Sequence, residues 1–300
     1  MPYVEASVPV IPCPDQLSPE HLEQFREVGC VAFEAVLTEA EVEAARSALT
    51  EITCRLMEKA QSGEAEIRER PNATRNYAGP QVIDPDSGFG IHFEVGVDPL
   101  AMPVEEAELV FRKLHGYHQE HPTFIALTQH PRIKGFIEQI LDEEAILKAE
   151  MALSKPPFIG SEKPWHQDNA YFNWLPLTKV ATAWIALDDT TIENGCMHVL
   201  PGGHTLGALK HHHSIDCEIL PDRIEKARAV PVEIKAGGVM YFSAMLPHQT
   251  PPNRTAGRRR ALQFQYRGVT TTQVSKEEFG KVFAEEDGTP ASCALAHENG

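Results

Sequence analysis

The sequence has 300 residues, 42% of them hydrophobic, and its 27 Lys and Arg against 43 Asp and Glu give a formal net charge of −16. This negative balance argues against nucleic acid and anionic membrane surfaces as partners. The longest apolar runs fall short of the roughly 18–20 residues of a membrane span, so we expect neither a spanning helix nor a signal peptide.

Helix signals dominate the amino-terminal part of the chain. Residues 1–14 contain four prolines and are predicted to form an extended arm on the surface. Ser18 and Pro19 suit the N-cap and first position of a helix that ends at Gly29. A longer helix is predicted to begin at the capping box T-x-x-E of residues 38–41.

The hydrophobic pattern changes along the middle of the chain. Residues 61–104 are polar and rich in Gly and Pro, so we expect loops and short strands there. Amphipathic helices are predicted over 105–121 and 131–141. From residue 145 onward apolar and polar residues alternate with period two, which is typical of half-buried strands. The strands expected on this basis cover residues 147–153, 179–187, 196–200, 239–244 and 259–266.

Two further features are interpreted without a functional role. The six cysteines form no C-x-x-C pair, so we expect reduced thiols and a cytoplasmic protein. The run His211-His212-His213 lies in a polar stretch and is predicted to be a solvated loop rather than a metal site.

A histidine and a carboxylate stand two residues apart, as His166 and Asp168. Positions i and i+2 of a strand project from the same face, so both side chains can reach one metal ion. His248, which follows the strand predicted at 239–244, is the candidate for a third ligand. Two histidines and one carboxylate form the facial triad of non-haem Fe(II) oxygenases, which leaves positions open for a cosubstrate, O2 or water.

A basic run, Arg258-Arg259-Arg260, opens the strand that follows His248. Arg259 would share a face with polar residues of that strand, which we expect to line a cavity. Its planar guanidinium can clamp a carboxylate such as that of 2-oxoglutarate. Thr250, two residues beyond His248, could add a hydroxyl donor. A structural ion pair with Asp or Glu is the alternative role for Arg259.

These residues belong to a longer pattern. The H-x-D motif of residues 166–168 is followed by the segment ENGCMHVLPGGH at 193–204, and Arg259 lies eleven residues after His248. The segment QFREVGCV at 24–31 precedes them. Together these segments resemble the phytanoyl-CoA dioxygenase family of Fe(II)/2-oxoglutarate oxygenases.

The resemblance covers about residues 15–270. It implies a mainly β fold with flanking α-helices, in which a double-stranded β-helix (jelly-roll or cupin-like) barrel is backed by amino-terminal helices. It also implies Fe(II), with 2-oxoglutarate and O2 as cosubstrates, and oxidation of a C–H bond of a small molecule with release of succinate and CO2. Hydroxylation is the first expectation rather than halogenation, because related halogenases have a small residue where this chain has Asp168; desaturation, epoxidation and endoperoxide formation would use the same three ligands and stay open as alternatives.

The resemblance implies additional residues beside the cosubstrate, namely Arg112, Met151 and Trp184. Ordinary packing in the core is the alternative for Met151 and Trp184. We expect one domain over residues 1–300, with the arm at 1–14 and a tail at 270–300, as a monomer or homodimer. An uncharged or weakly cationic natural product would suit the acidic balance as substrate. A cupin-like barrel with another metal (an isomerase or hydrolase) and a binding barrel without turnover remain the alternatives.

Overall fold

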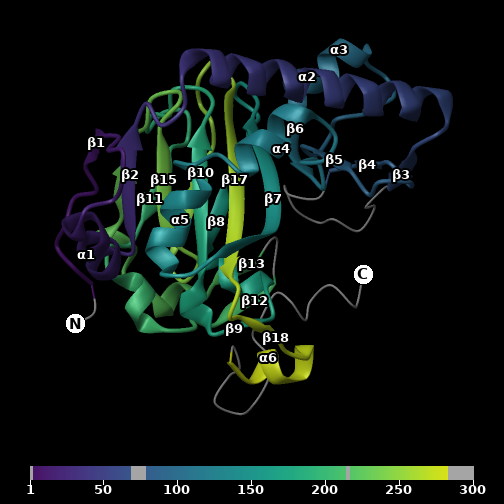
Figure 1. The fold of residues 1–300 in the computed structure, drawn as a ribbon. Coiled ribbons are helices and arrows are strands. Elements are labelled where there is room, and N and C mark those ends of the chain that lie inside the picture. The colour runs from purple at the N-terminus through teal and green to yellow at the C-terminus, as the bar shows by residue number, and fades with distance from the viewer. Residues whose placement is uncertain (1–2, 69–78, 214–216, 283–300) are drawn as a thin grey trace.

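Two sheets and a set of covering helices make up the structure, a computed structural model that describes residues 3–68, 79–213 and 217–282 (Figure 1). The large sheet has ten strands in the order β1 (Val10–Pro12), β2 (Cys30–Glu34), β15 (Val239–Ser243), β10 (Val180–Ala186), β17 (Arg259–Gly268), β7 (Ala145–Lys155), β6 (Phe111–His115), β5 (Gly90–Phe93), β4 (Gln81–Ile83) and β3 (Glu66–Arg68). The small sheet has four, in the order β14 (Val230–Val232), β11 (Met197–Val199), β16 (His248–Thr250) and β8 (Lys163–His166).

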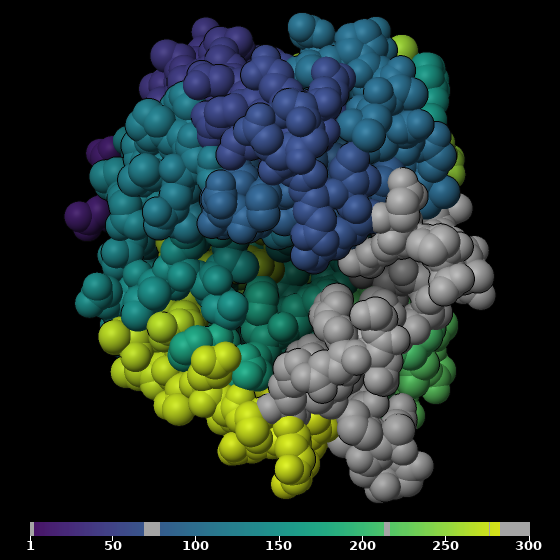
Figure 2. All heavy atoms as spheres, turned by 90° about the vertical axis from the view of Figure 1, so that its right-hand side faces the viewer, coloured from purple at the N-terminus to yellow at the C-terminus, as the bar shows by residue number. Residues whose placement is uncertain are grey.

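Two short ribbons and six helices complete the described part of the chain. The ribbons pair β12 (His211–His213) with β13 (Cys217–Ile219), and β9 (Trp174–Leu175) with β18 (Thr272–Gln273). The helices are α1 (Pro19–Val28), α2 (Glu39–Ser62), α3 (Val104–Val110), α4 (Pro122–Thr128), α5 (Lys134–Leu141) and α6 (Lys276–Val282). Figure 2 shows one face of the molecule, hollowed between the blue residues of its upper part and the yellow residues near the carboxyl terminus.

The boundaries of the first two helices follow from local capping, as predicted. The Ser18 hydroxyl accepts a hydrogen bond from the backbone N–H of His21, Pro19 occupies the first turn, and Gly29 ends α1 with φ +91°. In α2 the Thr38 hydroxyl accepts from the Glu41 N–H, while the Glu41 carboxylate accepts from the Thr38 N–H at 2.8 Å. Each cap satisfies amide groups that the helix leaves unpaired.

The predicted helix over residues 105–121 is confirmed as far as Val110 and is wrong beyond it. Helix α3 ends at Val110, and the next five residues form β6, which pairs with β5 and β7. Gly116, with φ +68°, then turns the chain out of the strand. Pairing on both edges of a strand, with Phe111 and Leu114 buried, outweighs the helical preference of the local sequence.

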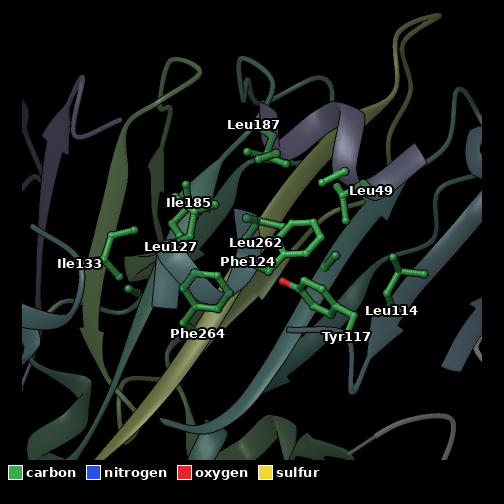
Figure 3. Close-up of a cluster of buried hydrophobic side chains, with 14 of the residues drawn as sticks. Leu49, Leu114, Tyr117, Phe124, Leu127, Ile133, Ile185, Leu187, Leu262 and Phe264 are labelled. Atoms are coloured by element: carbon green, nitrogen blue, oxygen red, sulfur yellow. The ribbon is translucent and has the colours of Figure 1, made fainter. Parts of the chain in front are cut away.

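The strands of the large sheet separate two apolar layers because their side chains alternate between its faces. On the outer face, β10 and β17 pack against helices (Figure 3), through Leu49, Leu114, Tyr117, Phe124, Leu127, Ile133, Ile185, Leu187, Leu262 and Phe264. The inner face contributes a second buried cluster with residues of the small sheet, among them Trp184, Met197, Val199, Met240 and Ala261. The candidate site lies on this inner face.

The chain ends and the cysteines differ in part from expectation. Part of the arm, Val10–Pro12, forms strand β1 and pairs in parallel with β2. Cys217 is disulfide-bonded, so the expectation of reduced thiols throughout is wrong for that residue. Among the described residues, the free thiols are Cys13, Cys30, Cys54 and Cys196. Within the described ranges, the helices are all too short or too polar to cross a membrane.

Candidate active site

Three buried side chains converge where β8 and β16 lie side by side. His166 ends β8, His248 begins β16, and the two are direct partners in the antiparallel register. Asp168 follows at the start of a 3-10 turn. One ligand atom from each of the three lies within 4.8 Å of the others. The Asp168 Oδ1 is 3.4 Å from the His166 Nε2 and 3.6 Å from the His248 Nε2. This spacing suits a single metal ion held by all three.

Backbone carbonyls orient both imidazoles. The Nδ1 of His166 lies 2.8 Å from the Pro164 carbonyl oxygen, and the Nδ1 of His248 lies 2.9 Å from that of Leu246. A carbonyl can only accept, so each Nδ1 carries the proton and each Nε2 keeps its lone pair. Such contacts fix the tautomer that binds a metal. Burial, the largest effect, lowers the pKa of His248 to about 4, which also favours the neutral ring.

The Asp168 carboxylate is held from its other oxygen. Its Oδ2 accepts hydrogen bonds from the Thr182 hydroxyl at 2.8 Å and from the Gln263 Nε2 at 3.3 Å, so Oδ1 faces the histidines. Burial acts to raise the pKa of the Asp168 carboxyl, but its polar contacts with His248, His166 and Gln265 together outweigh burial and hold the pKa below its usual value. Two neutral nitrogens and one carboxylate oxygen match the ligands of non-haem Fe(II).

Arg259 lies on the same inner face, 1% exposed. Its Nη2 donates to the Gly195 carbonyl at 3.0 Å, and its guanidinium carbon is 5.4 Å from the Trp184 ring centroid. Its Nε has no hydrogen-bond partner among the described residues. Burial lowers its pKa to about 10, so it remains charged at neutral pH. Among the residues that the structure describes, no carboxylate forms an ion pair with it. The structural ion pair considered as an alternative is therefore absent from that part of the chain.

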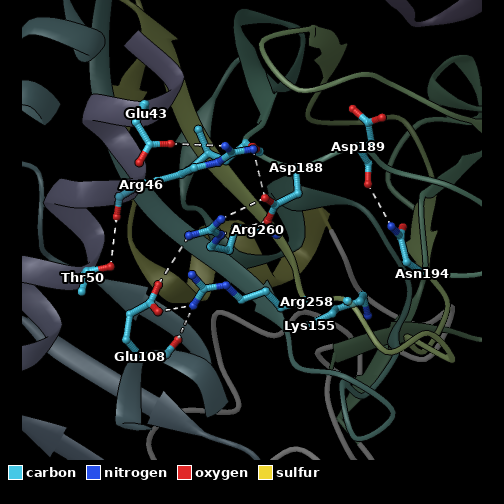
Figure 4. Close-up of polar contacts among 12 residues, drawn as sticks. Glu43, Arg46, Thr50, Glu108, Lys155, Asp188, Asp189, Asn194, Arg258 and Arg260 are labelled. Carbon is cyan, nitrogen blue, oxygen red and sulfur yellow. Dashed lines mark hydrogen bonds and ion pairs between the residues drawn. The ribbon is translucent and has the colours of Figure 1, made fainter. Parts of the chain in front are cut away.

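The flanking arginines, Arg258 and Arg260, point toward carboxylates (Figure 4). Arg260 makes two hydrogen bonds of 2.9 Å to Asp188, and Arg258 pairs with Glu108. Because side chains alternate along β17, these two arginines face outward to carboxylates, and Arg259 is the member of the run 258–260 that faces inward.

Lys155 is a second buried basic residue that the sequence did not single out. It stands opposite Arg259 in the register of β7 and β17. Its Nζ donates to the Thr250 carbonyl at 3.3 Å and to the Ser161 carbonyl. Burial is the main cause that lowers its pKa well below the ordinary value. Gly195, with φ +84°, leaves room for its stem, because a Cβ there would lie 3.1 Å from the Lys155 Cδ.

The other predicted site residues are distributed as follows. Met151 and Trp184 flank Gln263 in the register of the large sheet and share its inner face. Thr250 is buried. Arg112 lies in β6 rather than in a helix, and its Nη2 is 3.5 Å from the Glu162 carbonyl oxygen.

The register of β6 brings a neighbour of Arg112 to the inner face. Lys113 is paired with Leu153 and His115 with Met151, so Lys113 shares the face that carries Met151 and Arg259. Lys113 was not predicted as a site residue, because its segment was expected to be helical.

His211 was also missed, because the predicted solvated loop is wrong for this residue. His211 is 3% exposed. Its Nε2 accepts a hydrogen bond from the Gln167 backbone N–H at 3.0 Å, and its Nδ1 donates to the Leu209 carbonyl at 2.7 Å. It thereby holds the backbone between His166 and Asp168. A run of three histidines carries no signal that one member is buried.

Comparisons with known proteins agree with this arrangement. A family model described as Phytanoyl-CoA dioxygenase (PhyH) matches residues 25–261. The phytanoyl-CoA dioxygenase domain-containing protein 1 of Danio rerio is 25% identical over 268 residues, which cover 83% of this chain and 90% of that protein. The peroxisomal phytanoyl-CoA dioxygenase of Homo sapiens is 27% identical over 195 residues, covering 58% of this chain and 57% of that protein.

Solved structures show the same fold. The non-heme alpha ketoglutarate dependent carbocyclase SnoK from nogalamycin biosynthesis matches with a TM-score of 0.63 and 24% identity, over 87% of this chain and 88% of that one. EvdO2 from Micromonospora carbonacea var. aurantiaca complexed with 2-oxoglutarate matches with a TM-score of 0.59 and 24% identity, over 88% and 96%. The predicted mainly β barrel with flanking helices is confirmed.

Proposed function

The chain belongs to the phytanoyl-CoA dioxygenase family of Fe(II)/2-oxoglutarate-dependent oxygenases, and from this premise we propose that it hydroxylates a C–H bond of a small molecule at a metal held by His166, Asp168 and His248. The observation that carries the proposal is the convergence of these three buried ligand atoms within 4.8 Å. We propose further that residues 1–300 form one domain around this centre.

The donor set suits the expected cosubstrates. Two neutral imidazoles and one carboxylate leave one net positive charge on a divalent ion, which favours an anionic 2-oxo acid as the next ligand. When bound, Fe(II) and 2-oxoglutarate supply O2 activation coupled to decarboxylation of the 2-oxo acid to succinate and CO2. The Thr182 and Gln263 hydrogen bonds keep Asp168 Oδ2 occupied, so the carboxylate presents Oδ1 to the metal position.

Arg259 is proposed to bind the distal carboxylate of 2-oxoglutarate. A charged guanidinium buried without a carboxylate is costly, and its unpartnered Nε adds a free donor. A carboxylate ligand would remove both penalties. Lys155, opposite Arg259, supplies a second basic group at the same end of β17. Met151 and Trp184 would form the apolar wall beside the cosubstrate, and Thr250 would add a hydroxyl donor. Arg112, whose charge contributes to lowering the pKa of Lys155, is proposed to lie near the cosubstrate as well.

The test is release of CO2 from carboxyl-labelled 2-oxoglutarate by the protein supplied with Fe(II) and O2. We expect wild-type release above the metal-free level, and loss of that release in His166→Ala and His248→Ala. His198→Ala is the matched control, because His198 lies in the neighbouring strand β11 of the same small sheet and outside the ligand group. Equal release by wild type and by both ligand variants would contradict the proposal.

A further inference from the structure

A second pair of basic side chains lies at the other end of β17 from Arg259. Arg267 follows Gln265 by two residues, so it projects from the same inner face, about 7 Å further along the strand. Gln265 pairs with Thr182, whose hydroxyl binds Asp168. The inner face of β17 therefore runs from Arg259, past the three candidate metal ligands, to Arg267.

Both cations of this end lie over aromatic rings. The Arg267 guanidinium carbon is 3.8 Å from the centroid of the Trp174 ring. The Lys148 Nζ is 5.2 Å from the centroid of the Phe172 ring. Both rings come from the segment that directly follows Asp168. Strand β9 carries Trp174 and pairs with β18, just beyond the end of β17 (Figure 1). We call Lys148, Phe172, Trp174 and Arg267 the mouth cluster.

The cations and the indole N–H of the mouth cluster have few hydrogen-bond acceptors and no carboxylate partner among the described residues. Neither Lys148 nor Arg267 forms an ion pair with any carboxylate that the structure describes, and Arg267 donates only to the Thr271 hydroxyl, at 3.2 Å. The indole Nε1 of Trp174 is buried and has no hydrogen-bond partner in the part of the chain that the structure describes. Burial and the charge of Arg267 both lower the pKa of Lys148, as two cations held close together would do.

The adjacent carboxylate, Glu150, acts to raise the pKa of Lys148 but offsets the burial and the charge of Arg267 only in part. Glu150 faces the other side of the sheet, where it pairs with Phe264 in the register and accepts from the His118 ring and backbone. A local excess of positive charge beside the site is notable in a chain whose net charge is −16.

We propose that the mouth cluster binds an oxyanion of the substrate, a carboxylate or a phosphate ester, with Phe172 and Trp174 covering the apolar body attached to it. Unpaired cations and an indole N–H are complementary to such a group, and aromatic faces suit an apolar or planar body. The inference rests on the proposed function in identifying the ligand as substrate. It replaces the expectation of an uncharged or weakly cationic substrate with an anionic one.

The experiment is calorimetric titration of the metal-free full chain with three probes of similar size: phenyl phosphate, phenylacetate and the neutral benzyl alcohol. We expect saturable binding of at least one anion, at least about tenfold tighter than benzyl alcohol and weakened by added salt. The anion that binds more tightly distinguishes phosphate ester from carboxylate. The double variant Lys148→Gln/Arg267→Gln should weaken anion binding about tenfold or more.

Two control variants separate this site from other cations. Arg228→Gln removes a cation that lies over a different ring, that of Tyr3, at 5.8 Å, and should bind the anion like wild type. Arg259→Gln tests whether the probe occupies the other end of β17, where Arg259 is proposed to bind the carboxylate of 2-oxoglutarate; the mouth cluster is supported when the double variant weakens binding more than Arg259→Gln does. The inference is overturned if no anion binds saturably, if benzyl alcohol binds equally well, or if affinity is lost with Arg259→Gln but not with the double variant.

Failure of the proposed function would be seen separately. Binding of Fe(II) and 2-oxoglutarate to the double variant, followed by visible absorbance, should match wild type. A wild-type protein that binds phenyl phosphate but not the Fe(II)/2-oxoglutarate pair would contradict the proposed function and leave the anion site in place.

Discussion

Arg259 and Lys155 stand directly opposite each other on β17 and β7, both buried on the inner face of the large sheet. Neither forms an ion pair with a carboxylate in the described part of the chain, whereas Arg258 and Arg260 are both paired on the outer face. Two basic groups that the fold brings together without an acid indicate a place for an anionic ligand. This relationship leads to the first two predictions.

Replacing Arg259 by Gln should weaken binding of 2-oxoglutarate to the metal-loaded protein by about 1.5–3 kcal/mol, because a charge-assisted contact is lost. Equilibrium titration with 2-oxoglutarate measures the change. Arg258→Gln is the matched control, since that arginine pairs with Glu108 on the outer face. Equal affinities of Arg259→Gln and wild type would make Arg259 a structural residue.

Lys155 should couple cosubstrate binding to protonation. Burial lowers its pKa well below the ordinary value in the free protein, and a nearby carboxylate would raise that pKa again. Binding of 2-oxoglutarate should therefore take up protons, and its affinity should fall as pH rises above the free-state pKa of Lys155. Calorimetry in two buffers of different ionisation enthalpy measures the uptake. Lys155→Met should abolish it, and identical proton uptake by this variant and wild type would contradict the role.

The hydrogen bond from Thr182 to Asp168 should support metal affinity. Thr182→Val removes the 2.8 Å contact to Oδ2 at nearly constant volume. Partners of metal ligands typically contribute about 10–100-fold in affinity, so Fe(II) binding should weaken by about that factor. Thr190→Val is the control, because the Thr190 hydroxyl is equally buried but bonds to the Ile234 carbonyl, away from the ligands. An equal effect of both substitutions on Fe(II) affinity would assign the Thr182 contact to stability alone.

The lowered pKa of His211 should make the stability of the metal-free protein depend on pH. Burial, the main cause, lowers its pKa to about 3 from an ordinary value of 6.5. Between these values the unfolded chain binds a proton at His211 that the native state does not bind. The contribution of His211 to the free energy of unfolding is therefore fully present above pH 6.5 and is lost as pH falls toward 3.

Urea unfolding across this pH range measures the effect. His211→Gln keeps an acceptor for the Gln167 N–H but removes the titration, so its stability should fall less steeply with decreasing pH than that of wild type. Parallel pH profiles would show that His211 does not contribute to the acid sensitivity.

The sequence predicts those features whose determinants are local. The capping box of Thr38 and Glu41 defines the start of α2, and the spacing of His166 and Asp168 indicates two ligands on one face. Period-two alternation after residue 145 predicts β7, β10 and β17. Strand β6 was not predictable in this way, because residues 111–115 become a strand only through pairing with β5 and β7.

Roles that depend on register are hidden from the sequence for the same reason. Lys155 is one basic residue among many until β7 and β17 pair and place it opposite Arg259. His211 becomes buried only when β12 packs beside the Gln167 backbone. The pairing of Arg258 and Arg260 with distant carboxylates separates them from Arg259, which composition alone does not distinguish.

The most direct test of the proposed metal centre is an anaerobic titration of the metal-free protein, first with Fe(II) and then with 2-oxoglutarate, followed by visible absorbance. We predict a metal-to-ligand charge-transfer band only when both are present, in wild type and in His198→Ala, and no band in His166→Ala or His248→Ala. A wild-type protein that binds Fe(II) without developing the band, or a band that survives in both ligand variants, would contradict the assignment of His166, Asp168 and His248 as the Fe(II) ligands.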